Sequence, residues 1–274
     1  MKLPEQNSTD TAGSFSLEGR LILLTGASGH LGRAMAAGLS DAGAEVIACG
    51  RSAERLAVLK TGVKGVVETM VFDIKDPQQC SQAGAAMTMR FGRLDGLVNN
   101  AYAPSVGVFG MVSAEEFSSS LAEGLTGPFA LVQACFPLMK NSYERGLLGG
   151  ASIVNIASMY GVVSPDPRIY GTSGANNPPQ YGATKAGLIQ LTRYLACHLA
   201  PHGIRCNSIS PGPFPNPEAL AKDGEFAARL ESKIPLGRIG EAREMVGPLV
   251  FLCSPASSFV TGTNLTVDGG WTAW

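Results

Sequence analysis

The sequence lacks an excess of charge of either sign. Its 274 residues contain 21 Lys and Arg against 22 Asp and Glu, which gives a formal net charge of −1 at pH 7. A protein that binds the phosphate backbone of nucleic acid needs a basic surface, so we expect no nucleic-acid partner. The first ten residues also lack the apolar segment that a secretory signal requires, and we expect a cytoplasmic protein.

No segment is well suited to span a membrane. The uncharged run of residues 146–165 contains four glycines, three serines and a terminal proline, which favour a buried strand between turns over a spanning helix. We therefore expect no membrane partner. The six cysteines include no C-x-x-C pair, so we predict buried free thiols of a reducing compartment, with neither disulfides nor a metal site.

Glycine, in contrast, is abundant, with 34 residues and no collagen-like period, and short apolar runs alternate with helical patterns. Strands are predicted at residues 20–25, 45–49, 66–72, 94–98, 152–157, 204–209 and 264–267. Helices are predicted at residues 31–41 and near 53–60, 76–90, 114–140, 180–200 and 241–252. Strands that are apolar throughout are typical of a parallel sheet covered on both faces. The sequence predicts an α/β protein with a doubly wound, Rossmann-type parallel sheet of about seven strands flanked by helices.

This pattern predicts one domain over residues 16–274, preceded by a flexible tail of residues 1–15. Two irregular segments interrupt the alternation, at residues 160–180 and 211–235. Both follow predicted strands at their carboxyl ends, which is the edge where open α/β sheets bind ligands. We therefore expect these loops to be functional.

The first strand-to-helix turn, residues 25–32, reads TGASGHLG. Glycines in such a turn let the backbone approach a pyrophosphate at a helix N-terminus, so the turn predicts a dinucleotide site. After the second strand, the position that is usually acidic is Arg51. Its guanidinium can bind a 2′-phosphate, which a carboxylate would repel, and we expect NADP(H) to be favoured over NAD(H). The alternative is a solvated arginine at a helix start.

A phenol and an ammonium, Tyr181 and Lys185, are four residues apart in a predicted helix and so share one face. Ser158 directly follows the strand predicted at residues 152–157. At the carboxyl end of that strand it would lie at the ligand edge of the sheet, beside the helix. The three side chains are candidates for one catalytic group.

Four features follow one another along the chain: the turn at residues 25–32, the NNA run at residues 99–101, Ser158, and the pair Tyr181/Lys185. In these features the chain resembles the short-chain dehydrogenase/reductase family, and the resemblance extends over nearly its whole length. The resemblance implies a nicotinamide cofactor and interconversion of a secondary alcohol and a ketone. It implies that Tyr181 is the general acid/base, that Ser158 binds the substrate oxygen, and that Lys185 holds the nicotinamide ribose and lowers the pKa of Tyr181. The candidate cofactor contacts are Gly26, Ser28, His30, Leu31, Gly32, Arg51, Asp73, Ile74, Asn99, Ala101, Tyr181, Lys185, Pro211 and Gly212.

The sequence departs from the family pattern at three positions. His30 and Tyr102 each replace a glycine, and the imidazole of His30 is either a phosphate or ribose contact or a surface group. Gly124 replaces an asparagine that in many members anchors a proton-relay water. We expect water or backbone to substitute there, so that Gly124→Asn leaves kcat within roughly tenfold of wild type.

The interval from Ser158 to Tyr181, 23 residues, is longer than is usual in the family. Its polar residues suit a small, hydroxyl-rich substrate such as a sugar derivative, and the alternative is a surface or subunit-contact loop. These residues are Asp166, Arg168, Tyr170, Asn176 and Asn177. Two other functions stay open: a non-catalytic NAD(P)-binding regulatory or structural protein, and an isomerase or lyase of the same fold. The resemblance also implies a homo-oligomer, a tetramer or dimer, and the tryptophans at 271 and 274 support it.

Overall fold

The structure is a computed structural model, which describes residues 11–103, 107–171, 173, 176–216, 220 and 225–274. Three of the predicted segments lie partly outside the described residues. These are the tail, of which residues 1–10 are not described, the loop at 160–180 (residues 172, 174 and 175) and the loop at 211–235 (residues 217–219 and 221–224).

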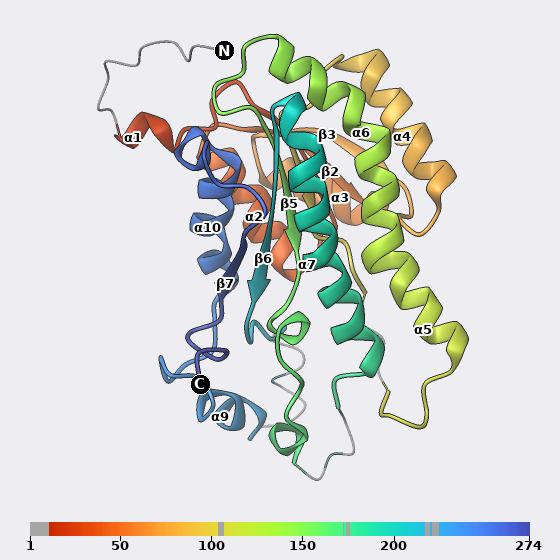
Figure 1. The fold of residues 1–274 in the computed structure, drawn as a ribbon, viewed down its shortest axis with the longest axis vertical. Helices are drawn as coiled ribbons and strands as arrows, with labels where there is room; N and C mark the ends of the chain where they lie inside the picture. Colours follow the sequence, from red (N-terminus) through yellow and green to blue (C-terminus); the bar gives the residue numbers. More distant parts are fainter. Residues whose placement is uncertain (1–10, 104–106, 172, 174–175, 217–219, 221–224) are drawn as a thin grey trace.

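Seven strands form one parallel sheet in the order β3-β2-β1-β4-β5-β6-β7 (Figure 1). The strands are β1 Leu21–Thr25, β2 Glu45–Gly50, β3 Val66–Val71, β4 Gly96–Asn99, β5 Ala151–Ile156, β6 Ile204–Pro211 and β7 Asn264–Val267. Every residue of β1, β4, β5 and β6 is buried, because helices cover both faces of the sheet. The predicted doubly wound α/β fold is confirmed, and residues 146–165 contain the predicted strand.

All of the α-helices of the described residues except the short α1 and α9 match predicted segments. The α-helices are α1 Thr11–Ser14, α2 His30–Asp41, α3 Ala53–Gly62, α4 Pro77–Arg90, α5 Ala114–Leu121, α6 Gly127–Glu144, α7 Pro179–Leu199, α9 Phe226–Glu231 and α10 Val246–Cys253. The predicted helix at 114–140 is interrupted by a π-helical turn, Ala122–Thr126, between α5 and α6. Short 3₁₀ turns precede α10 at Ala242–Met245 and follow β5 at Met159–Gly161. No helix among the described residues is long and apolar enough to cross a membrane.

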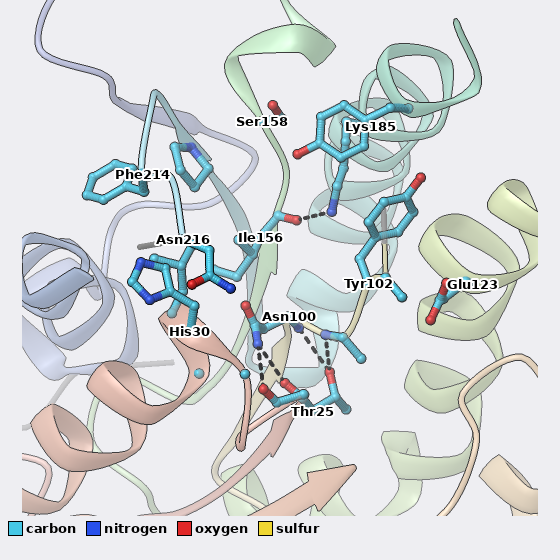
Figure 2. A pocket seen from close by; sticks show the side chains of 18 of the residues that line it. Thr25, His30, Asn100, Tyr102, Glu123, Ile156, Ser158, Lys185, Phe214 and Asn216 are labelled. Carbon is cyan, nitrogen blue, oxygen red and sulfur yellow. Dashed lines mark hydrogen bonds between the residues drawn. The ribbon is translucent and has the colours of Figure 1, made fainter. Parts of the chain in front are cut away.

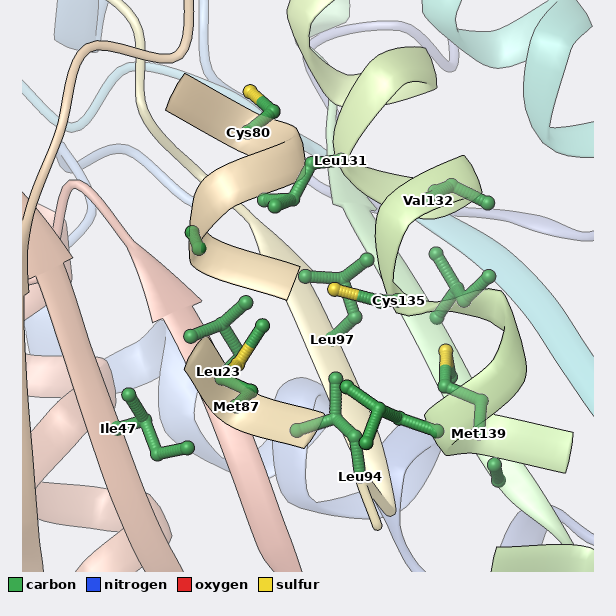
Figure 3. Close-up of a cluster of buried hydrophobic side chains, with 14 of the residues drawn as sticks. Leu23, Ile47, Cys80, Met87, Leu94, Leu97, Leu131, Val132, Cys135 and Met139 are labelled. Carbon is green, nitrogen blue, oxygen red and sulfur yellow. The ribbon is translucent and has the colours of Figure 1, made fainter. Parts of the chain in front are cut away.

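Two hydrophobic clusters hold the layers together. One joins α4, α6 and α7 to the sheet, and Figure 3 shows its centre, where Leu23 and Leu97 of adjacent strands meet Cys135 of α6. The other joins α2, α3 and α10 to the opposite face, with Met35 and Leu249 fully buried. Each fully buried aliphatic side chain contributes about 1.5–3 kcal/mol by leaving water. The sheet is therefore a rigid platform for its loops.

Of the predicted N-terminal tail the structure describes residues 11–15, and the predicted domain begins just after them. Thr11–Ser14 forms one helical turn, and Leu17 is fully buried, with its N–H bonded to the carbonyl of Ala42. All six cysteines are free, and all but Cys197 are buried. The predicted burial is therefore wrong for Cys197, which lies on an outward-facing position of α7.

Candidate active site

A cavity of about 900 Å³ opens at the carboxyl ends of the strands, where the order of the chain reverses between β1 and β4 (Figure 2). Its volume is within the usual range for a ligand site. It brings together nearly all of the sequence-predicted site residues. Those on its wall are Gly26, Ser28, His30, Leu31, Gly32, Arg51, Asp73, Ile74, Ala101, Ser158, Tyr181, Lys185, Pro211 and Gly212.

Asn99 is the exception, because its side chain points into the sheet. It is 3% exposed, and its amide donates to Asn155 Oδ1 at 2.8 Å. The next residue, Asn100, lines the cavity instead. Its backbone and side-chain N–H groups bond Thr25 and Gly26, which ties the end of β4 to the glycine turn (Figure 2).

The glycine turn is closely packed at Gly26 and Gly32, where there is no room for a side chain. Gly26 has φ +62°, and a Cβ on it would lie 2.9 Å from the Cα of Ala101. A Cβ on Gly32 would lie 2.1 Å from the carbonyl oxygen of Gly26. Helix α2 begins directly after the turn, and its N-cap, Gly29, has no side chain to cap the first N–H groups. These N–H groups face a ligand site, as anion binding at a helix N-terminus requires.

Positive charge lies beside this turn. Arg55 lines the cavity, and its Nη2 donates to the carbonyl of Ser28 at 2.8 Å, where Arg33 Nε also donates at 3.1 Å. Arg51 extends from the end of β2 with 56% of its side chain exposed. The site thus combines helix N–H groups without a side-chain cap, a turn with no room for side chains at Gly26 and Gly32, and flanking guanidinium groups. This combination fits a phosphate-containing dinucleotide.

The predicted catalytic residues meet at the other end of the cavity. Ser158 follows β5, and both Tyr181 and Lys185 come from the first turns of α7. Lys185 is 4% exposed, and its Nζ donates to the carbonyl of Ile156 at 2.8 Å (Figure 2). The same Nζ lies 5.9 Å from the ring centroid of Tyr181. The geometry places a phenol, a hydroxyl and an ammonium around one space.

Burial shifts the pKa values of Tyr181 and Lys185. It raises the pKa of Tyr181, and a hydrogen bond with Ser158 offsets part of the rise in the pKa. Burial also lowers the pKa of Lys185 to about 8, against the attraction of the Glu123 carboxylate. Lys185, whose ammonium bonds the Ile156 carbonyl, does not contribute to this shift in the pKa of Tyr181, and its expected lowering of that pKa stays a prediction.

Two departures from the family pattern, Tyr102 and Gly124, form one packing arrangement. A Cβ on Gly124, in the π-helical turn, would lie 2.9 Å from Cδ2 of Tyr102 and 2.4 Å from Cγ2 of Thr184. The Tyr102 hydroxyl bonds Ser120 Oγ at 2.7 Å, and its ring lies 4.7 Å from the ammonium of Lys185. Tyr102 therefore occupies the space of a side chain at 124. On this geometry we expect Gly124→Asn to destabilise the fold, and the expected effect on kcat, within roughly tenfold, stays a prediction.

The wall beside Ser158 and Tyr181 is mostly apolar. Its residues are Met159, Ile169, Phe214, Phe226 and Leu230, together with Tyr160, Tyr170 and Asn177. Of the polar residues predicted for this region, Tyr170 and Asn177 line the cavity, and Asn176 lines a smaller neighbouring one. Asp166 instead pairs with Arg168 at 2.8 Å and with Lys233, away from the main cavity.

Comparison with known proteins places this fold and site in a family. The profile of the family described as enoyl-(acyl carrier protein) reductase matches residues 26–272. A tropinone reductase homolog of Arabidopsis thaliana is 35% identical over 271 residues, which cover 97% of this chain and 94% of the relative. The chain belongs to the short-chain dehydrogenase/reductase family. As a member, it is an NAD(P)-dependent oxidoreductase.

Solved structures of this short-chain dehydrogenase/reductase family have the same fold. The Pseudomonas aeruginosa RhlG complex with NADP has a TM-score of 0.85 and 30% identity, covering 94% of this chain and 98% of that one. A gluconate 5-dehydrogenase of Burkholderia cenocepacia, in complex with NADP and tartrate, has a TM-score of 0.84 and 30% identity, covering 96% of this chain and 98% of that one.

Among the cavity residues of this short-chain dehydrogenase/reductase that sequence reasoning missed are Arg55, Asn100 and Glu123. Arg55 lies one helical turn after Arg51, a spacing that could have identified it. Asn100 lies beside a predicted residue, but the sequence does not say which of the two faces the cavity. Glu123 offered no signal, because it lay within a segment that reads as one continuous helix.

Proposed function

We propose that this chain interconverts a ketone and a secondary alcohol, with Tyr181 as the general acid/base. The observation that carries the proposal is the convergence of Tyr181, Ser158 and Lys185 on one wall of a cavity whose other end is the glycine turn. These three groups, in this arrangement, are sufficient for acid/base catalysis at a carbonyl oxygen.

The roles follow from the protonation of each group. With its pKa raised by burial, Tyr181 is a neutral phenol near pH 7, which is the form that donates a proton to a carbonyl oxygen during reduction. Ser158 donates a hydrogen bond to the same oxygen and orients it. Lys185, anchored by the Ile156 carbonyl, holds the ribose of the cofactor. When bound, the nicotinamide supplies or accepts the hydride.

We propose that NADP(H) is favoured over NAD(H). Arg51 and Arg55 place two guanidinium groups at the end of the cavity formed by β2, and no carboxylate occupies residues 48–52. Two related structures, RhlG and the gluconate 5-dehydrogenase, are described as NADP complexes, which supports the same choice here.

For the substrate, we propose a small polar, sugar-derived molecule. Asn177 Oδ1 is buried on the cavity wall with no hydrogen-bond partner among the described residues, and Tyr170 lies nearby on the same wall. Buried polar groups without a partner favour a ligand that satisfies them. A compact apolar ketone is the second candidate, because Met159, Phe214 and Phe226 line the same region.

A substrate panel tests the proposal. Keto-sugar acids, ketoses, cyclic ketones and acyl thioester ketones are each incubated with NADPH or NADH, and the absorbance at 340 nm is followed. We expect cofactor oxidation with a hydroxyl-rich ketone, faster with NADPH. Cofactor oxidation with cyclic ketones alone would support the compact apolar ketone as the substrate instead. Cofactor binding without turnover of any compound, or product isomers formed without net cofactor oxidation, would support the non-catalytic or the isomerase alternative.

We also propose that the chain assembles as a homo-oligomer, a tetramer or a dimer. Large apolar side chains are exposed on α6 and α7, where Phe129 and Tyr194 are 39% and 55% exposed. The C-terminal tryptophans differ from the expectation, because Trp271 is buried in a hydrophobic cluster and only Trp274 is exposed. Exposed aromatic residues on long helices favour a subunit contact.

A further inference from the structure

Glu123 is a buried carboxylate on the cavity wall for which neither the family pattern nor the proposed mechanism has a use. It lies in the π-helical turn between α5 and α6, and 7% of its side chain is exposed. It lines the cavity together with Arg51, Asp73 and Ile74, three of the candidate cofactor contacts. Figure 2 shows it beyond Tyr102, on the side away from Ser158.

Two cations from separate elements face this carboxylate. Its Oε1 is 4.0 Å from Nη1 of Arg51, which follows β2, and its Oε2 is 3.9 Å from Nζ of Lys75, which follows β3. Lys75 also donates to Ser119 Oγ at 3.1 Å. A buried carboxylate is costly unless opposite charge compensates it, so Glu123 attracts both cations.

The same guanidinium is the group available to a 2′-phosphate. Arginine binds phosphate through two parallel N–H groups, and Arg51 cannot direct them fully to a phosphate while it faces Glu123. A phosphate held by Arg51 would also lie near the carboxylate. Like charges in a partly buried site repel more strongly than in water, because screening is weaker there.

We propose that Glu123 is a cofactor-specificity residue: its carboxylate competes with the 2′-phosphate for Arg51 and lowers the preference for NADP(H) over NAD(H). This inference rests on the proposed cofactor site. It predicts that the chain uses both cofactors, with a smaller preference for NADP(H) than Arg51 alone would give. Removal of the carboxylate charge should enlarge that preference.

Calorimetric binding of 2′,5′-ADP and 5′-AMP tests the inference without substrate or turnover. The two probes differ in the 2′-phosphate alone. For Glu123→Gln, which keeps the shape and removes the charge, we expect the Kd of 2′,5′-ADP to fall about tenfold, or about 1.4 kcal/mol. The Kd of 5′-AMP should stay within about twofold. Glu115→Gln, on the exposed first turn of α5, is the matched control and should change neither Kd.

The Arg51→Ala background separates competition from simple repulsion. There the gain from Glu123→Gln should shrink to within about twofold, because the guanidinium that faces Glu123 is gone. A full tenfold gain in that background would overturn the role of Arg51. If Glu123→Gln does not fold, Glu123→Leu replaces it, since an apolar side chain of similar size is often neutral or stabilising at a buried charged position.

The outcomes distinguish the inference from the proposed function. An unchanged or weakened affinity of Glu123→Gln for 2′,5′-ADP, with wild type binding both probes, overturns the inference alone and makes Glu123 a group that orders Arg51. Failure of the wild type to bind either probe overturns the proposed cofactor site itself.

Discussion

The buried ammonium of Lys185 gives a quantitative prediction about stability. Burial lowers the pKa of Lys185 from its usual 10.5 to about 8. Each pKa unit corresponds to about 1.4 kcal/mol, so the folded state carries a penalty of about 3 kcal/mol whenever the lysine is protonated in both states. Lys185→Met removes this titration, because methionine has a similar length and no charge.

The sign follows from proton linkage. Below about pH 8 the ammonium is present in the folded and unfolded chain, and the whole penalty applies. Above pH 10.5 both states are neutral and the penalty vanishes. The free energy of unfolding of wild type, relative to Lys185→Met, should therefore rise by most of about 3 kcal/mol from pH 7 to pH 10. Burial raises the pKa of the buried thiols of the folded protein above this range, whereas the thiols of the unfolded chain titrate within it. Both proteins share these thiols, so their contribution cancels in the difference.

Urea unfolding of both proteins at pH 7, 8, 9 and 10 measures this difference. Lys64→Met, at an exposed position before β3, is the control and should differ from wild type by a constant amount. Lys185→Met should lose turnover at every pH, since the group that holds the ribose is gone. A wild-type minus Lys185→Met difference that is constant within about 0.5 kcal/mol over this range would refute the reasoning.

Three further predictions concern the packing around Gly124, the role of Arg51 in cofactor preference, and the assembly. Gly124→Asn should lower the free energy of unfolding by about 1–3 kcal/mol in a urea titration, because a Cβ meets Thr184 at 2.4 Å, and an unchanged midpoint would contradict this. Adding Tyr102→Gly to that variant should recover part of the loss, whereas additive losses would show that the two positions do not share one space. Arg51→Ala should lower kcat/KM with NADPH by about tenfold or more and leave kcat/KM with NADH nearly unchanged; equal effects on both would remove the charge argument. Light scattering at micromolar concentration should give the mass of a dimer or tetramer, and a monomeric mass would defeat the proposed assembly.

The predictable features were those set by local chemistry. The apolar run of β1 and the glycines after it form a strand, turn and helix through interactions within about 20 residues, so their position in the site could be read directly. Asn99 shows the limit of such reading. Side chains alternate across a strand, and a shift of one residue moves a group from the cavity to the sheet interior. The motif does not fix which asparagine points outward.

The other differences depend on contacts between distant segments. Tyr102, Gly124 and Thr184 meet only in the folded protein, so the sequence showed two unrelated departures where the structure has one packed group. The π-helical turn adds a residue to one turn of a regular helical pattern and changes which side chains face the cavity, Glu123 among them. The short helix α9 was missed because six residues give too little periodicity to detect.

The most direct test of the account is the effect of Tyr181→Phe on turnover and cofactor binding, measured side by side. The phenylalanine ring keeps the packing and removes the hydroxyl, so turnover of the best substrate should fall by at least about a hundredfold while NADPH binds with nearly wild-type affinity. Tyr194→Phe, on the exposed face of the same helix, is the matched control and should stay fully active. Turnover by Tyr181→Phe within about tenfold of wild type would contradict the central claim that Tyr181 carries the proton.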